Sequence, residues 1–392
     1  MSTVDRNLTG LHRRWGLSPS TLAPGCFASV MATGIVSIGA ELAGWHLLSV
    51  GLLWLAVALY VFFTVLTVVR VLRYPDAVRA DLHDPSRAFG FFTAVAGTNI
   101  LGTGFVGLGM IPPALSLFIL GGLLCLVLGY GIPFTAILGS HTRPVSAGVN
   151  GTWLVWAVAA QSVAVVAASL GIELPNTSDS APGLVIFLVL TAVVMWAVGL
   201  SLYIVCVIAI IVRVLRHRFG PEDLDAPYWV TMGALAIAIV AGSRILDLGG
   251  TPLLEATRVL VGASSALLWA IATWLVPALV AAGIWRHAVH RVPMTYAAGL
   301  WSMVFPVGMY AVASIYLGRS DHVPAIEWIG QHWFWVSLAV WAIVFVAMVT
   351  SFIRTVLRPL SVGPRNTSSW QHNAPPATSR TCATVQDATD GA

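Results

Sequence analysis

The 392-residue chain contains no lysine, and only 9% of its residues are charged. Soluble domains carry about 25% charged residues, so this composition excludes a soluble enzyme. The twenty basic residues are all arginines, and they are scattered along the chain, which excludes a nucleic-acid-binding protein. A Walker A phosphate loop needs a lysine after its second glycine. The chain alone therefore does not drive transport with ATP.

Cysteine is scarce, and it is dispersed. Cys26, Cys125, Cys206 and Cys382 form no C-x-x-C pair, which excludes a disulfide framework and a cysteine metal site. The ten histidines fall in loops or at the ends of apolar runs, so no helix interior offers two of them to a metal. We therefore expect no metal, no cofactor and no redox chemistry.

Apolar residues are abundant instead, at 58% of the chain. A helix needs about 20 of them to cross a bilayer, where lipid offers the backbone no hydrogen-bond partners. We expect an all-α membrane protein whose transport domain covers residues 24–358. Its ten predicted spans are 24–45, 47–72, 88–110, 114–138, 151–171, 183–212, 227–249, 258–285, 296–318 and 332–356.

The two ends of the chain are polar. Residues 1–23 lack the apolar core of a signal peptide, so we expect a cytoplasmic N-terminal segment. Residues 359–392 are rich in Ser, Thr, Pro and Asn and predict a disordered cytoplasmic tail. With these spans, 17 of the 20 arginines fall on the side of the two termini. Since cytoplasmic loops hold the excess arginine, we expect a plasma-membrane (inner-membrane) protein with both termini inside.

The glycine content alternates from one predicted span to the next. The odd-numbered predicted spans contain 18 glycines in 112 residues, and the even-numbered spans contain 9 in 134. Because glycine lets helices approach closely, this contrast predicts five inner helices around a central pore and five outer helices facing lipid. The alternative is that glycine is simply common in membrane helices.

One motif resembles a dinucleotide-binding loop. Residues 102–107 match G-x-G-x-x-G, but the fold behind that motif requires a preceding strand and an acidic residue about 20 positions later. Here the motif lies in an apolar span, and the next acid is Glu173. We interpret these glycines as helix-packing positions. An intramembrane enzyme is a distant alternative, because the spans contain no H-E-x-x-H, no paired aspartates and no Ser with a His at depth.

Phe305 and Pro306 lie in the middle of the ninth predicted span. Proline removes a backbone hydrogen bond, so we expect a kink that frees the carbonyl of Ser302. A kink can turn the preceding aromatic ring toward the bundle axis. The alternative is that Phe305 is an ordinary packing residue.

Charged residues near the outer ends of two spans predict an outer vestibule. Arg244 and Asp247 are spaced i, i+3, so they share a helix face. The planar guanidinium of Arg244 could attract an anion, or the pair could lie at the lipid interface with its charges turned to water. Glu41 is a second charge near the outer end of the first span.

Uncharged polar residues concentrate on the odd-numbered spans and are our candidates for a pore lining. Such groups also hydrogen-bond between helices, so one polar residue alone is weak evidence for a pore. The prediction rests on the concentration of the whole set on the odd-numbered spans. The candidates are Thr33, Gly34, Ser37, Thr98, Asn99, Thr103, Gln161, Ser162 and Ser302.

Two segments resemble a known family. Residues 24–37, PGCFASVMATGIVS, are similar to the first helix of the tellurite-resistance/dicarboxylate transporter family, and residues 301–308, with Phe305 and Pro306, resemble its ninth helix. That family includes bacterial tellurite-resistance proteins, fungal malate and sulfite transporters and the slow anion channels of plant guard cells. The resemblance covers about residues 24–356. The fifth span departs from the family pattern, because it has no mid-helix proline.

The resemblance implies a homotrimer in the lipid bilayer, with one pore in each subunit and Phe305 in the position of a pore-occluding phenylalanine. We therefore expect a transporter of a small anion, such as a C4-dicarboxylate like malate, or tellurite or sulfite. The alternative is a passive channel for chloride or nitrate. No residue can be carried over as a dicarboxylate ligand.

Overall fold

The computed structural model describes residues 19–139, 144–176, 182–248 and 252–356, and every regular element in them is helical. The predicted tail and most of the predicted N-terminal segment lie outside these residues. Within the described residues, ten helices are long and apolar enough to cross a membrane. The prediction of an all-α membrane protein with ten spans is confirmed.

Five helices form an inner ring, and each begins with a short 3₁₀ turn. Every inner helix packs against two others, and the last packs against the first, so the ring is closed. Its members are η1 (Pro24–Phe27) with α2 (Ala28–Leu42), η2 (Ala88–Phe91) with α5 (Phe92–Gly107), η5 (Gly151–Trp153) with α7 (Leu154–Glu173), η7 (Ala226–Trp229) with α9 (Val230–Leu246), and η9 (Ala298–Leu300) with α11 (Trp301–Ser320).

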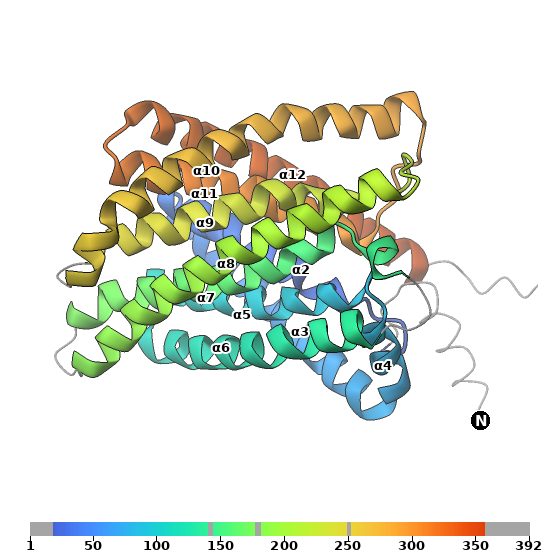
Figure 1. Cartoon of the computed structure of the whole chain (residues 1–392), viewed down its shortest axis with the longest axis horizontal. Coiled ribbons are helices and arrows are strands. Elements are labelled where there is room, and N and C mark those ends of the chain that lie inside the picture. Colours follow the sequence, from blue (N-terminus) through green and yellow to red (C-terminus); the bar gives the residue numbers. More distant parts are fainter. Residues whose placement is uncertain (1–18, 140–143, 177–181, 249–251, 357–392) are drawn as a thin grey trace, which may run out of the picture. The chain divides into compact units, whose positions relative to one another are not determined.

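The other five long helices surround this ring, as the glycine contrast predicts. In each inner helix 78% to 89% of the most apolar stretch is buried, against 6% to 22% in the outer helices. Figure 1 shows the later part of α10 along the upper edge of the bundle and α6 along the lower edge. The outer helices are α3 (His46–Arg73), α6 (Ile111–Pro133), α8 (Pro182–Arg216), α10 (Pro252–Ile284) and α12 (Pro324–Val356).

Several helix ends differ from the prediction. The tenth helix begins at Pro324 rather than at residue 332 because the polar side chains of its first turns have partners. Arg319 of the preceding helix pairs with Glu327 at 2.9 Å, and Gln331 donates to Glu327 at 3.2 Å. The eighth helix begins at Pro252 rather than at residue 258. The sequence did not predict the short helix α4 (Pro75–His83) or the 3₁₀ turns η4 (Val145–Gly148) and η6 (Leu174–Asn176). The π-helical turn η3 (Phe134–Leu138) ends the predicted span 114–138, and the π-helical turn η8 (Trp285–Val289) extends the eighth helix beyond its predicted end at residue 285.

A buried ion pair fastens α4 to the bundle. Asp81 accepts from Arg70 Nη2 at 2.5 Å and from Arg87 Nε at 2.6 Å, and the side chains of Asp81 and Arg70 are nearly inaccessible. Removing one partner of such a pair leaves a buried charge without a partner, which destabilises the fold. Arg70 and Arg87, expected only to set the topology, therefore also hold α3, α4 and the start of η2 together.

Glycine lets the inner helices pack closely. A Cβ added to Gly34 on α2 would lie 2.6 Å from Ile100 on α5, and one added to Gly104 would lie 2.6 Å from Leu53 on α3. Gly102 would meet Val166 of α7 at 3.1 Å. The glycines of the G-x-G-x-x-G sequence therefore face neighbouring helices inside α5, as the packing interpretation expects.

Gly151 is the sharpest test of this packing, because a Cβ there would lie 2.3 Å from the backbone carbon of Pro227 where η5 meets η7. We expect Gly151→Ala to lower the free energy of unfolding by about 1–3 kcal/mol, as overpacking does. Thermal unfolding of the purified protein measures this. Gly122→Ala on α6 is the matched control, since nothing lies within 4 Å of its added Cβ. Equal stability of the two variants would contradict the close contact.

Candidate functional site

A small cavity lies within the inner ring, and all five inner helices contribute to its wall. Its volume is about 20 Å³, enough for about one water-sized sphere, and its lining is mostly apolar. The lining residues are Ile35, Ile38, Ile100, Thr103, Ser162, Val165, Ile237, Val240, Met309, Val312 and Tyr316. We call this cavity the neck.

A larger cavity of about 320 Å³ adjoins the neck toward the C-terminal ends of the inner helices. The two cavities share Ile38, Thr103 and Tyr316 in their walls. We call the larger cavity the vestibule. Its other lining residues are Ser37, Glu41, Leu42, Ser49, Gly104, Val106, Gly107, Leu108, Gly109, Ser169, Glu173 and Arg244.

Phe305 lies on the other side of the neck. It precedes the lining residues Met309, Val312 and Tyr316 by four, seven and eleven residues, spacings that place all four side chains on one face of α11. Its side chain is 1% exposed and is not part of either cavity wall. Helix register therefore places the ring of Phe305 one turn beyond the neck, toward the N-terminal ends of the inner helices.

Pro306 is closer to the start of its helix than the sequence analysis expected. It lies in the second turn of α11, not in the middle, and the helix continues through it. Proline there deprives Ser302 of its usual i+4 donor. Gly233 makes room for the ring, because a Cβ on Gly233 would lie 2.7 Å from Pro306 Cγ. Pro306 thus packs against α9 directly beside Phe305.

Arg244 lies at the vestibule wall, in the last turn of α9. Its Nη1 is 3.5 Å from Asp247, its Nε is 3.4 Å from Ser169 Oγ, and its Cζ lies 5.4 Å from the ring centroid of Tyr316. Loss of solvent raises the pKa of the Asp247 carboxyl above its ordinary value, and the Arg244 guanidinium opposes this shift. Arg244 is thus the basic side chain of the vestibule lining.

Two glutamates share the vestibule with Arg244. Glu41 accepts from His46 Nδ1 at 2.9 Å rather than from Arg244. Glu173, which the sequence analysis did not select, lies at the end of α7. The vestibule lining therefore holds more carboxylates than guanidinium groups. In the described part of the chain, no three His, Cys, Asp or Glu side chains lie close enough to hold a metal ion.

Three of the predicted pore-lining polar residues bond to outer helices instead. Thr33 accepts from Trp341 of α12 at 3.1 Å, and Thr98 bonds to Tyr60 of α3 at 2.9 Å. Gln161 donates to the backbone oxygen of Trp196 on α8 at 3.0 Å. We therefore leave these three residues out of the proposed lining.

Three of the predicted lining residues do reach a cavity: Ser37, Thr103 and Ser162. Asn99 lies behind this lining, where its amide donates to Ser162 at 2.9 Å and its oxygen lies against Gly121 of α6. Gly34 packs against Ile100, and Ser302 lies in the first turn of α11, far from the vestibule. The sequence analysis missed Tyr316, although its spacing from Phe305 could have identified it.

A closed ring of membrane-spanning helices around an apolar cavity is typical of a multi-pass membrane transport protein. Residues 21–349 match the SLAC1 family, described as voltage-dependent anion channels. The chain belongs to this family, which includes the relatives that the two motifs of the sequence analysis resemble.

Three relatives show the range of the similarity. An uncharacterized membrane protein of Mycobacterium tuberculosis is 46% identical over 157 residues, 40% of this chain and 80% of that protein. An uncharacterized transporter of Methanocaldococcus jannaschii is 23% identical over 82% of this chain and 91% of its own length. A sulfite efflux pump of Trichophyton rubrum is 22% identical over 84% of this chain and 90% of its own.

Two isosteric substitutions test which threonines face the conduction path. Thr33→Val removes the acceptor of Trp341, so we expect it to lower the free energy of unfolding by about 1 kcal/mol and to leave anion flux unchanged. Thr103→Val makes the same change on the wall of both cavities, so we expect severalfold lower flux because the neck becomes less wettable. Flux per folded protein in liposomes compares them. A flux loss in Thr33→Val, or none in Thr103→Val, would contradict the assignment.

Proposed function

We propose that the chain transports small anions along the axis of the inner ring, through a pore that Phe305 closes. The observation that carries this proposal is the neck, because all five inner helices line it and Phe305 lies on the lining face of α11, one turn beyond. An apolar constriction blocks ions by excluding the water they need. The vestibule, with Arg244 and Glu41 in its wall, is the proposed outer mouth.

The family and the relatives support the proposed substrate class. The anion channels of the family and the sulfite efflux pump of Trichophyton rubrum support a small anion. The candidates are a C4-dicarboxylate such as malate and the oxyanions sulfite and tellurite. A passive channel for chloride or nitrate is the alternative, supported by the family description. Liposome flux across these anions, with and without a proton gradient, separates a proton-coupled carrier from a channel.

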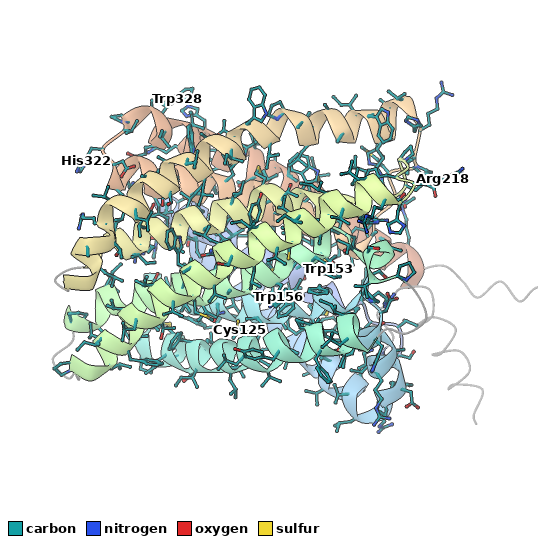
Figure 2. All side chains as sticks on the ribbon, in the orientation of Figure 1. Cys125, Trp153, Trp156, Arg218, His322 and Trp328 are labelled. Carbon is teal, nitrogen blue, oxygen red and sulfur yellow. The ribbon has the colours of Figure 1, made fainter. Side chains whose placement is uncertain are left out.

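We further propose a homotrimer in the plasma membrane, with one pore per subunit and both termini in the cytoplasm. Helices with exposed apolar faces surround the ring and supply surface for lipid and for neighbouring subunits. The arginine distribution supports the orientation. Figure 2 shows Arg218 at one end of the helices and His322 at the other, so these residues mark the proposed inner and outer ends.

Phe305→Ala is the direct test of the gate. Removing the ring should open a hydrated path and raise anion flux by roughly tenfold or more, because an apolar constriction is the barrier. Flux per folded protein in liposomes is the measurement. Phe92→Ala is the matched control: Phe92 is equally buried but lies at the start of α5 beside Phe89 and Trp156.

The control variant should lose about 3–5 kcal/mol of folding stability, the usual effect of truncating a core phenylalanine, without any gain in flux. A well-folded Phe305→Ala protein with unchanged or reduced flux would refute the gate. Higher flux in both variants would instead indicate a leak from loosened packing.

Cysteine labelling tests the orientation. In a Cys382→Ser background the remaining cysteines, Cys26, Cys125 and Cys206, are buried. We expect an impermeant thiol reagent added to intact cells to label His322→Cys, which is exposed between α11 and α12, and not Ser368→Cys in the tail. The opposite pattern would invert the topology.

A further inference from the structure

Three side chains with hydrogen-bond donors converge where the vestibule narrows into the neck. The Arg244 guanidinium lies beside the ring of Tyr316, and its Nε is 3.4 Å from Ser169 Oγ. Arg244 and Ser169 line the vestibule, whereas Tyr316 lines both cavities. These side chains come from α7, α9 and α11, which are consecutive helices of the inner ring, so they lie together on one side of the path.

The donors of this cluster are largely unused. A guanidinium carries five N–H donors, and within the described residues the side chain of Arg244 makes two long hydrogen bonds, at 3.4 Å and 3.5 Å. Among the described residues the Tyr316 hydroxyl has no hydrogen-bond partner. The Arg244 side chain is only 17% exposed, and partial shielding from water strengthens its pull on an anion.

We propose that Arg244, Tyr316 and Ser169 form a binding site for one singly charged oxyanion at the mouth of the neck. This inference rests on the proposed function and names the residues that select the substrate. The planar guanidinium offers two parallel donors to two oxygens of one anion, and the phenol and the serine hydroxyl can donate to others. Chloride, a single atom, can use this arrangement only in part.

The carboxylates of the vestibule set the charge that the site accepts. Glu41 and Glu173 line the same cavity, and Asp247 pairs with Arg244. In the cavity wall the Arg244 guanidinium therefore faces two carboxylates, and Asp247 is a third beside it. Two more arginines lie nearby: Arg258 acts on Asp247, and Arg319, near Tyr316, is bonded to Glu327 and to the backbone oxygen of Leu42. A second negative charge on the ligand adds repulsion from each carboxylate without adding an attractive partner. The site thus favours monoanions, such as nitrate or a singly ionised acid, over dianions such as sulfate.

Equilibrium binding of nitrate and sulfate to the purified full-length protein tests this site by calorimetry. We expect nitrate to bind more tightly than sulfate, and Tyr316→Phe to weaken nitrate about tenfold through loss of one hydrogen bond to a charged ligand. Arg244→Gln should weaken nitrate at least as much. Tyr310→Phe is the matched control on the same helix, since the Tyr310 hydroxyl bonds to Thr273 of α10 at 2.8 Å. Glu173→Gln should reduce the difference in binding affinity between nitrate and sulfate.

The outcomes separate this site from the proposed function. Unchanged nitrate affinity in a folded Tyr316→Phe protein, equal losses in Tyr316→Phe and Tyr310→Phe, or no nitrate binding by the wild-type chain would each overturn the site. If Phe305→Ala still conducts anions in that case, the proposed function stands without it. If nitrate binds as expected but no anion crosses the membrane in any variant, the site stands and the proposed pore fails.

Discussion

Polar groups at membrane depth must find hydrogen-bond partners inside the protein, because the lipid offers none. This requirement organises the contact between the two rings of helices. Trp196 of α8 donates to the backbone oxygen of Ala238 on α9 at 3.0 Å, and Trp269 of α10 donates to Ser314 on α11 at 2.9 Å. Trp341 of α12 donates to Thr33 on α2, and Tyr60 of α3 bonds to Thr98 on α5.

In each of these four contacts an aromatic side chain of an outer helix reaches the inner helix that comes next around the ring. Each contact fixes the rotation of an inner helix about its own axis, because the bonded residue must face outward. The opposite face of that helix then turns toward the axis. Hydrogen bonds on the outward faces of the inner helices therefore determine which side chains line the apolar neck.

This arrangement explains why the sequence predicted the architecture better than the lining. Lengths, apolar runs and glycine content report burial, and burial alternates strictly between inner and outer helices. The inner helices, however, are buried on nearly all sides, so apolar periodicity does not distinguish the axis from the neighbours. Thr33 and Thr103 are both threonines of inner spans, and only the positions of Trp341 and of the cavities separate them. Tyr316 was missed because composition does not select a single tyrosine, and its spacing of eleven residues from Phe305 was the one signal that connected it to the lining.

The predicted positions of the helix ends were wrong for a related reason. Glu327 and Gln331 are polar enough to end an apolar run, yet they lie in the first turns of α12, where Arg319 and each other satisfy them. The partner, Arg319, belongs to the preceding helix. A pairing of this kind depends on tertiary contact, so a window of single-chain hydropathy cannot detect it.

The same pairings determine which hydrogen-bond donors remain available to a ligand. The five inner helices point their C-terminal ends, with partial negative charge, toward the vestibule. Arg319 in the last turn of α11 is occupied, since it bonds to Glu327 and to the backbone oxygen of Leu42 at the end of α2. Arg244 in the last turn of α9 makes only long hydrogen bonds to the residues that the structure describes. The two arginines occupy similar places in their helices, but one is used to close the fold and the other keeps donors directed at the path.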